Sequence, residues 1–294
     1  MTDSEWLASR FEEQRPRLRG VAYRLLGSLS DADDAVQDAW LRLSGSDSGA
    51  IDNLGGWLTT VVARVCLNML RSRSNRREST LDDSLPDPIV IRDGRRMPDE
   101  EAILADSVSL ALLVVLGTLS PTERLSFVLH DMFDFPYGEI APLVGGTPAS
   151  ARQLASRARR RVRGAELPPP VETDRIRQRE AVDAFFLAAR EGDFNGLVAI
   201  LHPDAVLRSD FGGRRLDTDR LVRGAASIAG QALRFALPDA ELAPVLVSGN
   251  AGVLVLVGGW PTAIMGFTVR DGLVIEIDAI ADPERVQRIA AAAR

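Results

Sequence analysis

The first 80 residues carry apolar side chains at spacings of three and four, which is the period of amphipathic helices. One such stripe follows the capping-box pattern Ser30-Asp31-Ala32-Asp33 and consists of Ala32, Ala35, Val36, Ala39, Trp40 and Leu43. A Gly/Ser/Asp loop over 44–56 separates it from a further expected helix, Trp57–Leu70, which leads into the arginine-rich run 71–77. The pattern therefore predicts that residues 1–79 form an all-helical domain.

A second helical segment is expected over residues 101–165. Ser120-Pro121-Thr122-Glu123 has the form of a capping box with proline at the first helical position, and Gly145-Gly146 supplies a tight turn before a helix over 148–163. That last helix is rich in arginine, and no acidic residue lies between Glu139 and Glu166. A short apolar helix, a glycine turn and a basic helix in this order favour a DNA-binding helix-turn-helix over a solvated basic face.

Proline-rich stretches divide the chain further. The segment 80–100 contains Leu85-Pro86-Asp87-Pro88 and is expected to be a linker, and 166–173 is expected to be a stiff spacer. Residues 174–294 begin with expected helices at 175–191 and 194–201. Expected strands follow at 205–207, 244–247, 253–257, 263–269 and 273–280. Helices followed by several antiparallel strands predict an α+β domain with a curved sheet.

Composition adds limits to this picture. The net charge of -6 at pH 7 argues against a nucleic-acid partner for the chain as a whole. Positive charge is nevertheless concentrated at 64–77 and 152–163. The local electrostatic field at these segments can therefore attract nucleic acid despite the negative net charge. The single cysteine, Cys66, excludes an internal disulfide and a cysteine-rich zinc site. A polar N-terminus and the lack of a long apolar run indicate a cytoplasmic protein without a membrane partner, and no cofactor or metal is expected.

Several stretches resemble one protein family. Residues 23–28 with 31–43, and 56–64, are similar to domain 2 of bacterial sigma factors, and residues 119–163 are similar to domain 4. The C-terminal part, through 191–194, 209–214 and 266–269, resembles the SnoaL-like domain fused to one subgroup of extracytoplasmic-function (ECF) sigma factors, the SigJ type.

The resemblance implies a multi-domain fold: a helical-bundle domain 2, a helix-turn-helix domain 4 and an α+β SnoaL-like domain with a curved antiparallel sheet. It also implies an alternative sigma factor whose partners are core RNA polymerase and promoter DNA. A one-component DNA-binding regulator with a small-molecule-sensing domain is the alternative, since both need a helix-turn-helix. The acidic helix and the segment for melted DNA favour the sigma factor.

The resemblance further implies sites in the helical domains. The surface that docks on core polymerase is expected to comprise Asp33, Asp34, Gln37, Asp38 and Leu41, while Trp40, on the apolar stripe, is expected in the core. The melted minus-10 strand is expected to contact Arg64, Asn68, Arg71 and Arg73. The minus-35 duplex is expected to meet Ser150, Arg152, Gln153, Ser156, Arg157, Arg160 and Arg161. Asn68 either reads a flipped base or is simply solvated.

The regulatory motifs of the subgroup recur here in altered form. They correspond to Leu85, Pro86, Asp87 and Pro88 in the linker, to Asp210, Gly212, Gly213 and Arg214, and to Asp282 and Pro283. We expect the C-terminal domain to act on the sigma domains through these residues and to have no catalytic activity. An acid/base pair of His202 with Asp210 or Asp278 is the enzymatic alternative. A small-molecule ligand and a separate anti-sigma factor stay open.

Overall fold

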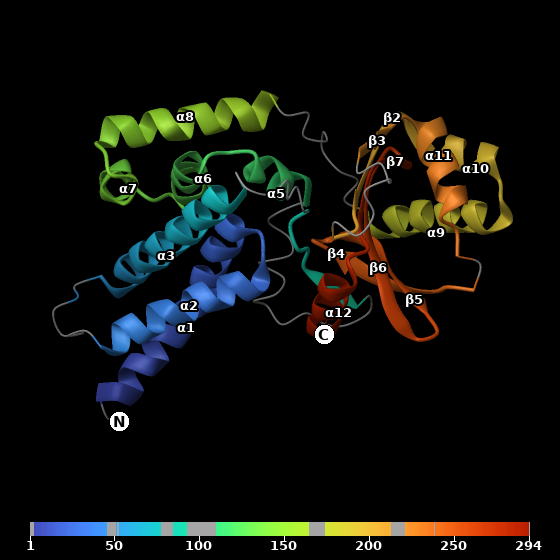
Figure 1. Ribbon diagram of the computed structural model, residues 1–294. Coiled ribbons are helices and arrows are strands. Elements are labelled where there is room, and N and C mark those ends of the chain that lie inside the picture. The colour runs from blue at the N-terminus through green and yellow to red at the C-terminus, as the bar shows by residue number, and fades with distance from the viewer. Residues whose placement is uncertain are drawn as a thin grey trace. The chain divides into compact units, whose positions relative to one another are not determined.

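The computed structural model describes residues 3–45, 51, 53–77, 85–92, 110–164, 174–212, 221–237 and 239–293. Its contacts divide the chain into two compact units, whose elements are labelled in Figure 1. Unit 1 comprises Met1–Asp82 and Ala111–Leu167, and unit 2 comprises Asp83–Leu110 and Pro168–Arg294. The two helical segments therefore group together, and the expected linker groups with the C-terminal part of the chain.

Unit 1 begins with three packed helices, α1 (Asp3–Leu26), α2 (Leu29–Ser44) and α3 (Leu54–Arg77). The hydroxyl of Ser28 accepts a hydrogen bond from the Asp31 backbone N–H, so α2 begins before the Ser30 capping box that the sequence suggested. The buried side chains of α2 are those of the apolar stripe, apart from the half-buried Trp40. Helix α3 continues through the arginine run that the sequence placed after the helix.

The second part of unit 1 contains α5 (Leu110–Gly117), α6 (Pro121–Phe127), a π-helical turn (Val128–Met132), α7 (Tyr137–Val144) and α8 (Pro148–Gly164). The Ser120/Glu123 capping box is formed. Gly145 ends α7 with a φ of 71°, a left-handed conformation that favours glycine. Helix α8 buries the small side chains Ala151, Ala155 and Ala158, which let it pack closely on α6 and α7.

Arg124 of α6 joins the two helical parts of unit 1. Its Nε and Nη2 atoms donate hydrogen bonds of 3.2 and 3.0 Å to the carbonyl oxygen of Arg24 near the end of α1. Arg73 of α3 donates to the carbonyl of Leu26 at 3.1 Å. Two guanidinium groups thus satisfy carbonyls that the end of α1 leaves without helical partners.

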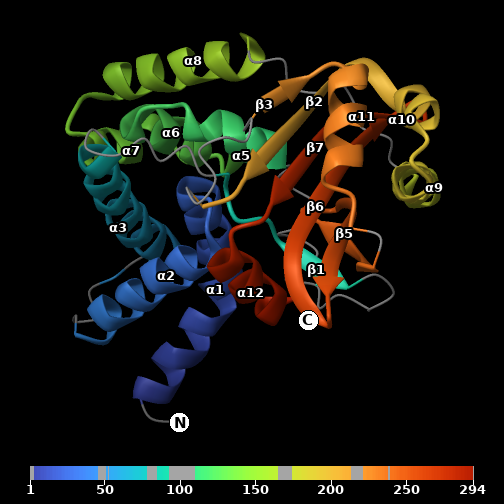
Figure 2. The ribbon, with the colours of Figure 1, turned by 45° about the vertical axis from the view of Figure 1, so that its right-hand side comes forward.

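Unit 2 is built on a seven-stranded sheet with the order β1-β4-β5-β6-β7-β2-β3. Its strands are β1 (Val90–Arg92), β2 (Leu201–Asp210), β3 (Leu221–Arg223), β4 (Glu241–Val247), β5 (Asn250–Val257), β6 (Trp260–Arg270) and β7 (Leu273–Ile280). Neighbouring strands are antiparallel except for the parallel pair β2 and β7. Figure 2 shows this sheet with its helices.

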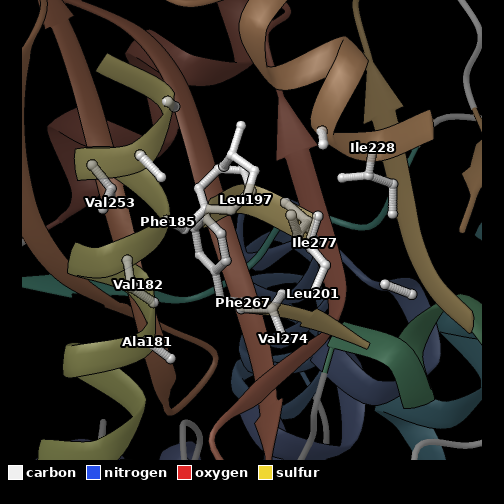
Figure 3. Close-up of a cluster of buried hydrophobic side chains, with 14 of the residues drawn as sticks. Ala181, Val182, Phe185, Leu197, Leu201, Ile228, Val253, Phe267, Val274 and Ile277 are labelled. Atoms are coloured by element: carbon white, nitrogen blue, oxygen red, sulfur yellow. The ribbon is translucent and has the colours of Figure 1, made fainter. Parts of the chain in front are cut away.

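Each face of the sheet supports its own hydrophobic cluster. Helices α9 (Arg175–Glu191), α10 (Phe194–Ile200) and α11 (Ala225–Arg234) cover one face. There Phe185 and Phe186 pack edge-on against Phe267 with ring centroids 5.4 and 5.7 Å apart; Figure 3 shows this cluster, with Phe185 and Phe267 labelled. Helix α12 (Pro283–Ala292) covers part of the other face, where Val286 and Ile289 pack in a cluster that includes Val90 of β1.

The fold class expected from the sequence is confirmed, with corrections in its details. The sheet is mixed rather than antiparallel because β2 returns parallel to β7. Strand β1 lies in the segment that the sequence predicted to be a plain linker. The prolines at 86 and 88 favour a linker, whereas the β-branched run Ile89-Val90-Ile91 that follows them forms the strand. His202 lies within β2 rather than at a helix end. The spacer 166–173 lies outside the described residues.

Candidate polymerase and nucleic-acid interfaces

The solvent-facing side of α2 carries carboxylates beside one large apolar side chain. Asp33, Asp34, Gln37, Asp38 and Leu41 are all exposed, and Leu41 is 59% exposed. Asp33 forms an ion pair with Arg19 of α1 at 2.7 Å, and Asp38 lies 3.6 Å from Arg42. Trp40 is half-buried with its ring 5.0 Å from that of Phe11, which places it at the edge of the core.

Three of the four residues expected at the melted strand share one face of α3. Arg64, Asn68 and Arg71 follow each other at spacings of four and three, and all are exposed. Arg73 lies on the opposite side of the helix, where it pairs with Asp31 and caps α1. The structure therefore brings three candidates together and gives Arg73 a contact inside the protein. The loop residues 46–50 and 52 lie outside the described part of the chain.

The arginines of α8 divide into a crest and two flanks. At 100° per residue, the exposed side chains Gln153, Arg157 and Arg160 project opposite the buried alanine stripe, and we call this side of α8 the crest. Arg152 and Arg159 lie on the flank beside α7, and Arg161 lies on the flank beside α6. Ser156 is half-buried. The crest is the part of α8 best placed to enter a DNA groove.

The start of α8 is fixed by a reciprocal pair of hydrogen bonds. The Thr147 backbone N–H donates to Ser150 Oγ at 2.8 Å, and the Ser150 backbone N–H donates to Thr147 Oγ1 at 3.2 Å. Thr147 therefore caps the helix with Ser150 as its reciprocal partner, and Gln153 lies one turn further along α8.

One flank of α8 is held by Tyr137 of α7. The Arg159 Nη2 atom donates to the Tyr137 hydroxyl at 2.7 Å, and the guanidinium of Arg152 lies 5.4 Å from the centre of the ring. His130 stacks on the same ring with centroids 3.9 Å apart, and Arg159 also pairs with Asp131 at 2.9 Å. Burial raises the pKa of Asp131, while the Arg159 guanidinium opposes that rise.

The other flank is held by Glu123 of α6, which sequence reasoning assigned only to the capping box. Its side chain is 7% exposed, and its oxygens lie 3.0 Å from Arg161 Nη1 and 3.5 Å from Arg157 Nε. The spacing of four between two arginines on a basic helix was the only signal in the sequence, and it does not identify the acid they share.

In unit 2, the expected regulatory residues meet around Arg285 of α12. Its guanidinium donates to Asp87 Oδ1 at 2.6 and 2.9 Å, to Asp210 Oδ2 at 2.5 Å and to the Leu85 carbonyl at 2.5 Å. The Leu85 backbone N–H also donates to Asp210 Oδ2 at 2.8 Å. The linker and the C-terminal domain are therefore bound by a charged, largely buried network, which we call the Arg285 network.

The remaining described members of this group adjoin the same network. Asp282 caps α12 by accepting from the Arg285 backbone N–H at 2.9 Å, and Pro283 occupies the first turn of that helix. Gly212 has a φ of 63°, and a Cβ atom there would collide with the Asp282 side chain, so the position favours glycine. Pro86 and Pro88 flank Asp87, while Gly213 and Arg214 lie outside the described residues.

The residues of the enzymatic alternative do not form an acid/base pair. His202 and Asp210 lie near opposite ends of β2. The His202 ring lies beside Arg270, and Asp278 pairs with Arg208 at 3.2 Å. Burial raises the pKa of Asp278 to about 6, with Arg208 opposing and Glu276 adding to the rise. His202, Asp210 and Asp278 thus each contact a different arginine.

Comparisons with known proteins agree with this architecture. The family model of Sigma-70 region 2 matches residues 10–76, and that of Sigma-70, region 4 matches residues 109–162. Together with the helix-turn-helix, these matches define a sigma factor. The chain is 36% identical to the ECF RNA polymerase sigma factor SigJ of Mycobacterium tuberculosis, over 94% of this chain and 92% of the relative. It is 31% identical to the probable ECF sigma factor SigI of that organism, over 99% and 98%.

The crystal structure of Mycobacterium tuberculosis SigJ superposes with a TM-score of 0.72 at 36% identity, covering 95% of this chain and 97% of that chain. The chain therefore belongs to the ECF RNA polymerase sigma factors. It is an alternative sigma factor that directs transcription, as members of this family bind core RNA polymerase and promoter DNA. Membership in the family decides against the one-component regulator.

None of the described helices combines the length and the apolar character that crossing a membrane requires. Within the described residues, no cluster of three or more His, Cys, Asp or Glu side chains could hold a metal ion.

Proposed function

We propose that the exposed face of α2 is the surface that docks on core RNA polymerase. An acidic helix face with an apolar side chain, Leu41, suits a basic partner surface with an apolar centre. Asp34 and Asp38 supply the charge, and Asp33 and Gln37 extend the face. Charge reversal at Asp34 and Asp38 should abolish co-purification with core polymerase. Reversal of Glu13, an equally exposed acid on α1, should leave co-purification intact; equal loss in both variants would count against the assignment.

We propose that α3 and α8 contact the two promoter elements. The Arg64, Asn68 and Arg71 face offers two cations and an amide to a melted strand. The crest of α8 offers Gln153 to a base edge, where a bidentate contact to adenine contributes about 1–3 kcal/mol of discrimination, and Arg160 to phosphate. Gln153→Ala should relax preference at one minus-35 position, whereas Arg160→Ala should weaken binding to all sequences alike. The reverse pattern would contradict these roles.

We propose that the C-terminal domain regulates the factor by holding the segment that joins the two sigma regions. The observation that carries this proposal is the Arg285 network together with the pairing of β1 on β4. Between Arg77 and Leu85 the chain spans at most about 28 Å when fully extended. While residues 85–92 stay docked, less chain is free to join the two sigma regions, so docking should shorten the separation that these regions can reach.

The same proposal gives the C-terminal domain no catalytic role. Its core under α9, α10 and α11 is filled by apolar side chains such as Phe185, Phe267 and Ile277 (Figure 3), and His202 lies apart from Asp210. The chain acts in the cytoplasm, where its polymerase partner transcribes. Run-off transcription with core polymerase tests the regulatory role: Arg285→Ala should raise transcript yield at equal concentration of the factor, and an unchanged yield would refute it.

A further inference from the structure

We propose that Glu123 lowers the affinity of α8 for DNA phosphates by holding Arg157 and Arg161 in ion pairs. The inference rests on the proposed contact between α8 and the minus-35 duplex. It assigns a function to a buried carboxylate that otherwise serves only as a helix cap.

The geometry places both arginines between Glu123 and solvent. Glu123 Oε1 lies 3.5 Å from Arg157 Nε, and Oε2 lies 3.0 Å from Arg161 Nη1. The carboxylate side chain is 7% exposed, while the arginine side chains are 55% and 56% exposed. A phosphate that approaches this side of α8 therefore meets two cations, and the one carboxylate behind them already offsets one of their two positive charges.

Glu123 cannot move aside when a phosphate arrives. Its Oε2 atom accepts from the Ser120 backbone N–H at 3.2 Å and from the Ser120 hydroxyl at 2.8 Å, as part of the capping box of α6. An arginine that leaves for a phosphate would leave this buried carboxylate short of a partner, which carries a desolvation cost. An arginine that stays shares its charge with two anions that repel each other.

Arg160 provides the internal comparison. It is exposed on the crest, and no carboxylate of the described residues pairs with it. Arg160 should therefore contribute a full phosphate contact, and Arg157 and Arg161 less than one each. Because phosphate contacts carry all of the nonspecific affinity, weakening two of them leaves a larger share of promoter binding to base contacts such as that of Gln153.

Glu123→Gln is the direct test, because glutamine serves at this position of a capping box while it removes the charge. Holoenzyme with this substitution should bind both a promoter duplex and an unrelated duplex more tightly, by about fivefold per added phosphate contact at 0.15 M salt. The slope of log K against log salt should steepen by about 0.9 per contact. Thermal unfolding checks that the cap is preserved. Unchanged affinity and slope in a folded variant would overturn the proposal.

Arg157→Gln with Arg161→Gln is the second variant, and it does not depend on the fold of the first. This pair should lower the salt slope of the holoenzyme by about 0.9 or less, and adding Glu123→Gln to it should bring a smaller gain in affinity than Glu123→Gln brings when both arginines are present. A slope reduced by about 1.8, the value for two full contacts, would refute the inference. Arg160→Ala separates the two hypotheses: if it lowers the slope by about 0.9, α8 does contact DNA, and if it has no effect, the α8 interface itself fails.

Discussion

Arg285→Ala removes the centre of the Arg285 network and is the sharpest perturbation of the linker. The arginine side chain is 15% exposed, and its partners Asp87 and Asp210 are 10% and 3% exposed. Alanine would leave both carboxylates largely buried without this cation. Arg288 is the matched control, since it lies one turn further along α12 and also contacts Asp87, at 3.0 Å, but is 52% exposed.

The two substitutions should differ strongly in their effect on linker docking. Removing one partner of a buried ion pair costs about 3–5 kcal/mol, whereas an exposed pair contributes about 0–1 kcal/mol. Since 1.4 kcal/mol is a factor of ten, Arg285→Ala should shift the docking equilibrium by about 10²- to 4 × 10³-fold. Arg288→Ala should shift it by about fivefold or less.

Amide hydrogen exchange of β1 reports this equilibrium directly. The register makes Ile91 and Leu246 a hydrogen-bonded pair, so the Ile91 and Leu246 amides and the Ser248 N–H, which donates to the Ile89 carbonyl at 2.7 Å, should lose protection in Arg285→Ala. Amides of β6 and β7, in the middle of the sheet, should keep theirs. Equal protection of β1 in the two variants would refute the reasoning that the buried network holds the linker.

Three further predictions concern the cores and the buried titratable groups. Phe267→Ala should lower the free energy of unfolding by about 3–5 kcal/mol and Phe267→Leu by less than about 1.5 kcal/mol, as measured in urea; equal losses would contradict the packing. Because burial raises the pKa of Asp278 to about 6, against about 3.9 when unfolded, the folded state binds the extra proton between these values. Stability should therefore fall as pH rises from about 4 to 6, and Asp278→Asn should flatten that fall; an unaltered profile would count against it. Burial also raises the pKa of the Cys66 thiol to about 12, so iodoacetamide at pH 8 should modify Cys66 only after unfolding, and rapid labelling of the native protein would disprove this.

Local patterns predicted those elements whose signals lie within a few residues. The Ser120/Glu123 capping box, the Gly145 turn and the arginine helix α8 were all expected, because caps and turns depend on adjacent side chains. Strand β7 matched its expected range for the same reason: Asp271-Gly272 forms the preceding turn, with a φ of 51° at Asp271.

Contacts between distant segments could not be predicted in this way. The pairing of β1 with β4 joins residues far apart in the chain. Proline at 86 and 88 favoured a linker over the strand that follows. The partners of Arg73, Arg161 and Arg285 likewise come from other elements, so the sequence could place these arginines on helices but could not say which of them face inward. Helix α12 was not expected, although its Asp282-Pro283 start and the spacing of Val286 and Ile289 are local signals of a helix.

Run-off transcription with purified core polymerase tests the central claim most directly, namely that the chain is a sigma factor restrained by its own C-terminal domain. The full chain should start transcripts at a promoter that core polymerase alone does not use, and Arg285→Ala should yield more transcript than Arg288→Ala at equal concentration. No transcript from a promoter library with saturating full chain would contradict the sigma-factor assignment, and equal yields from the two variants would contradict the restraint.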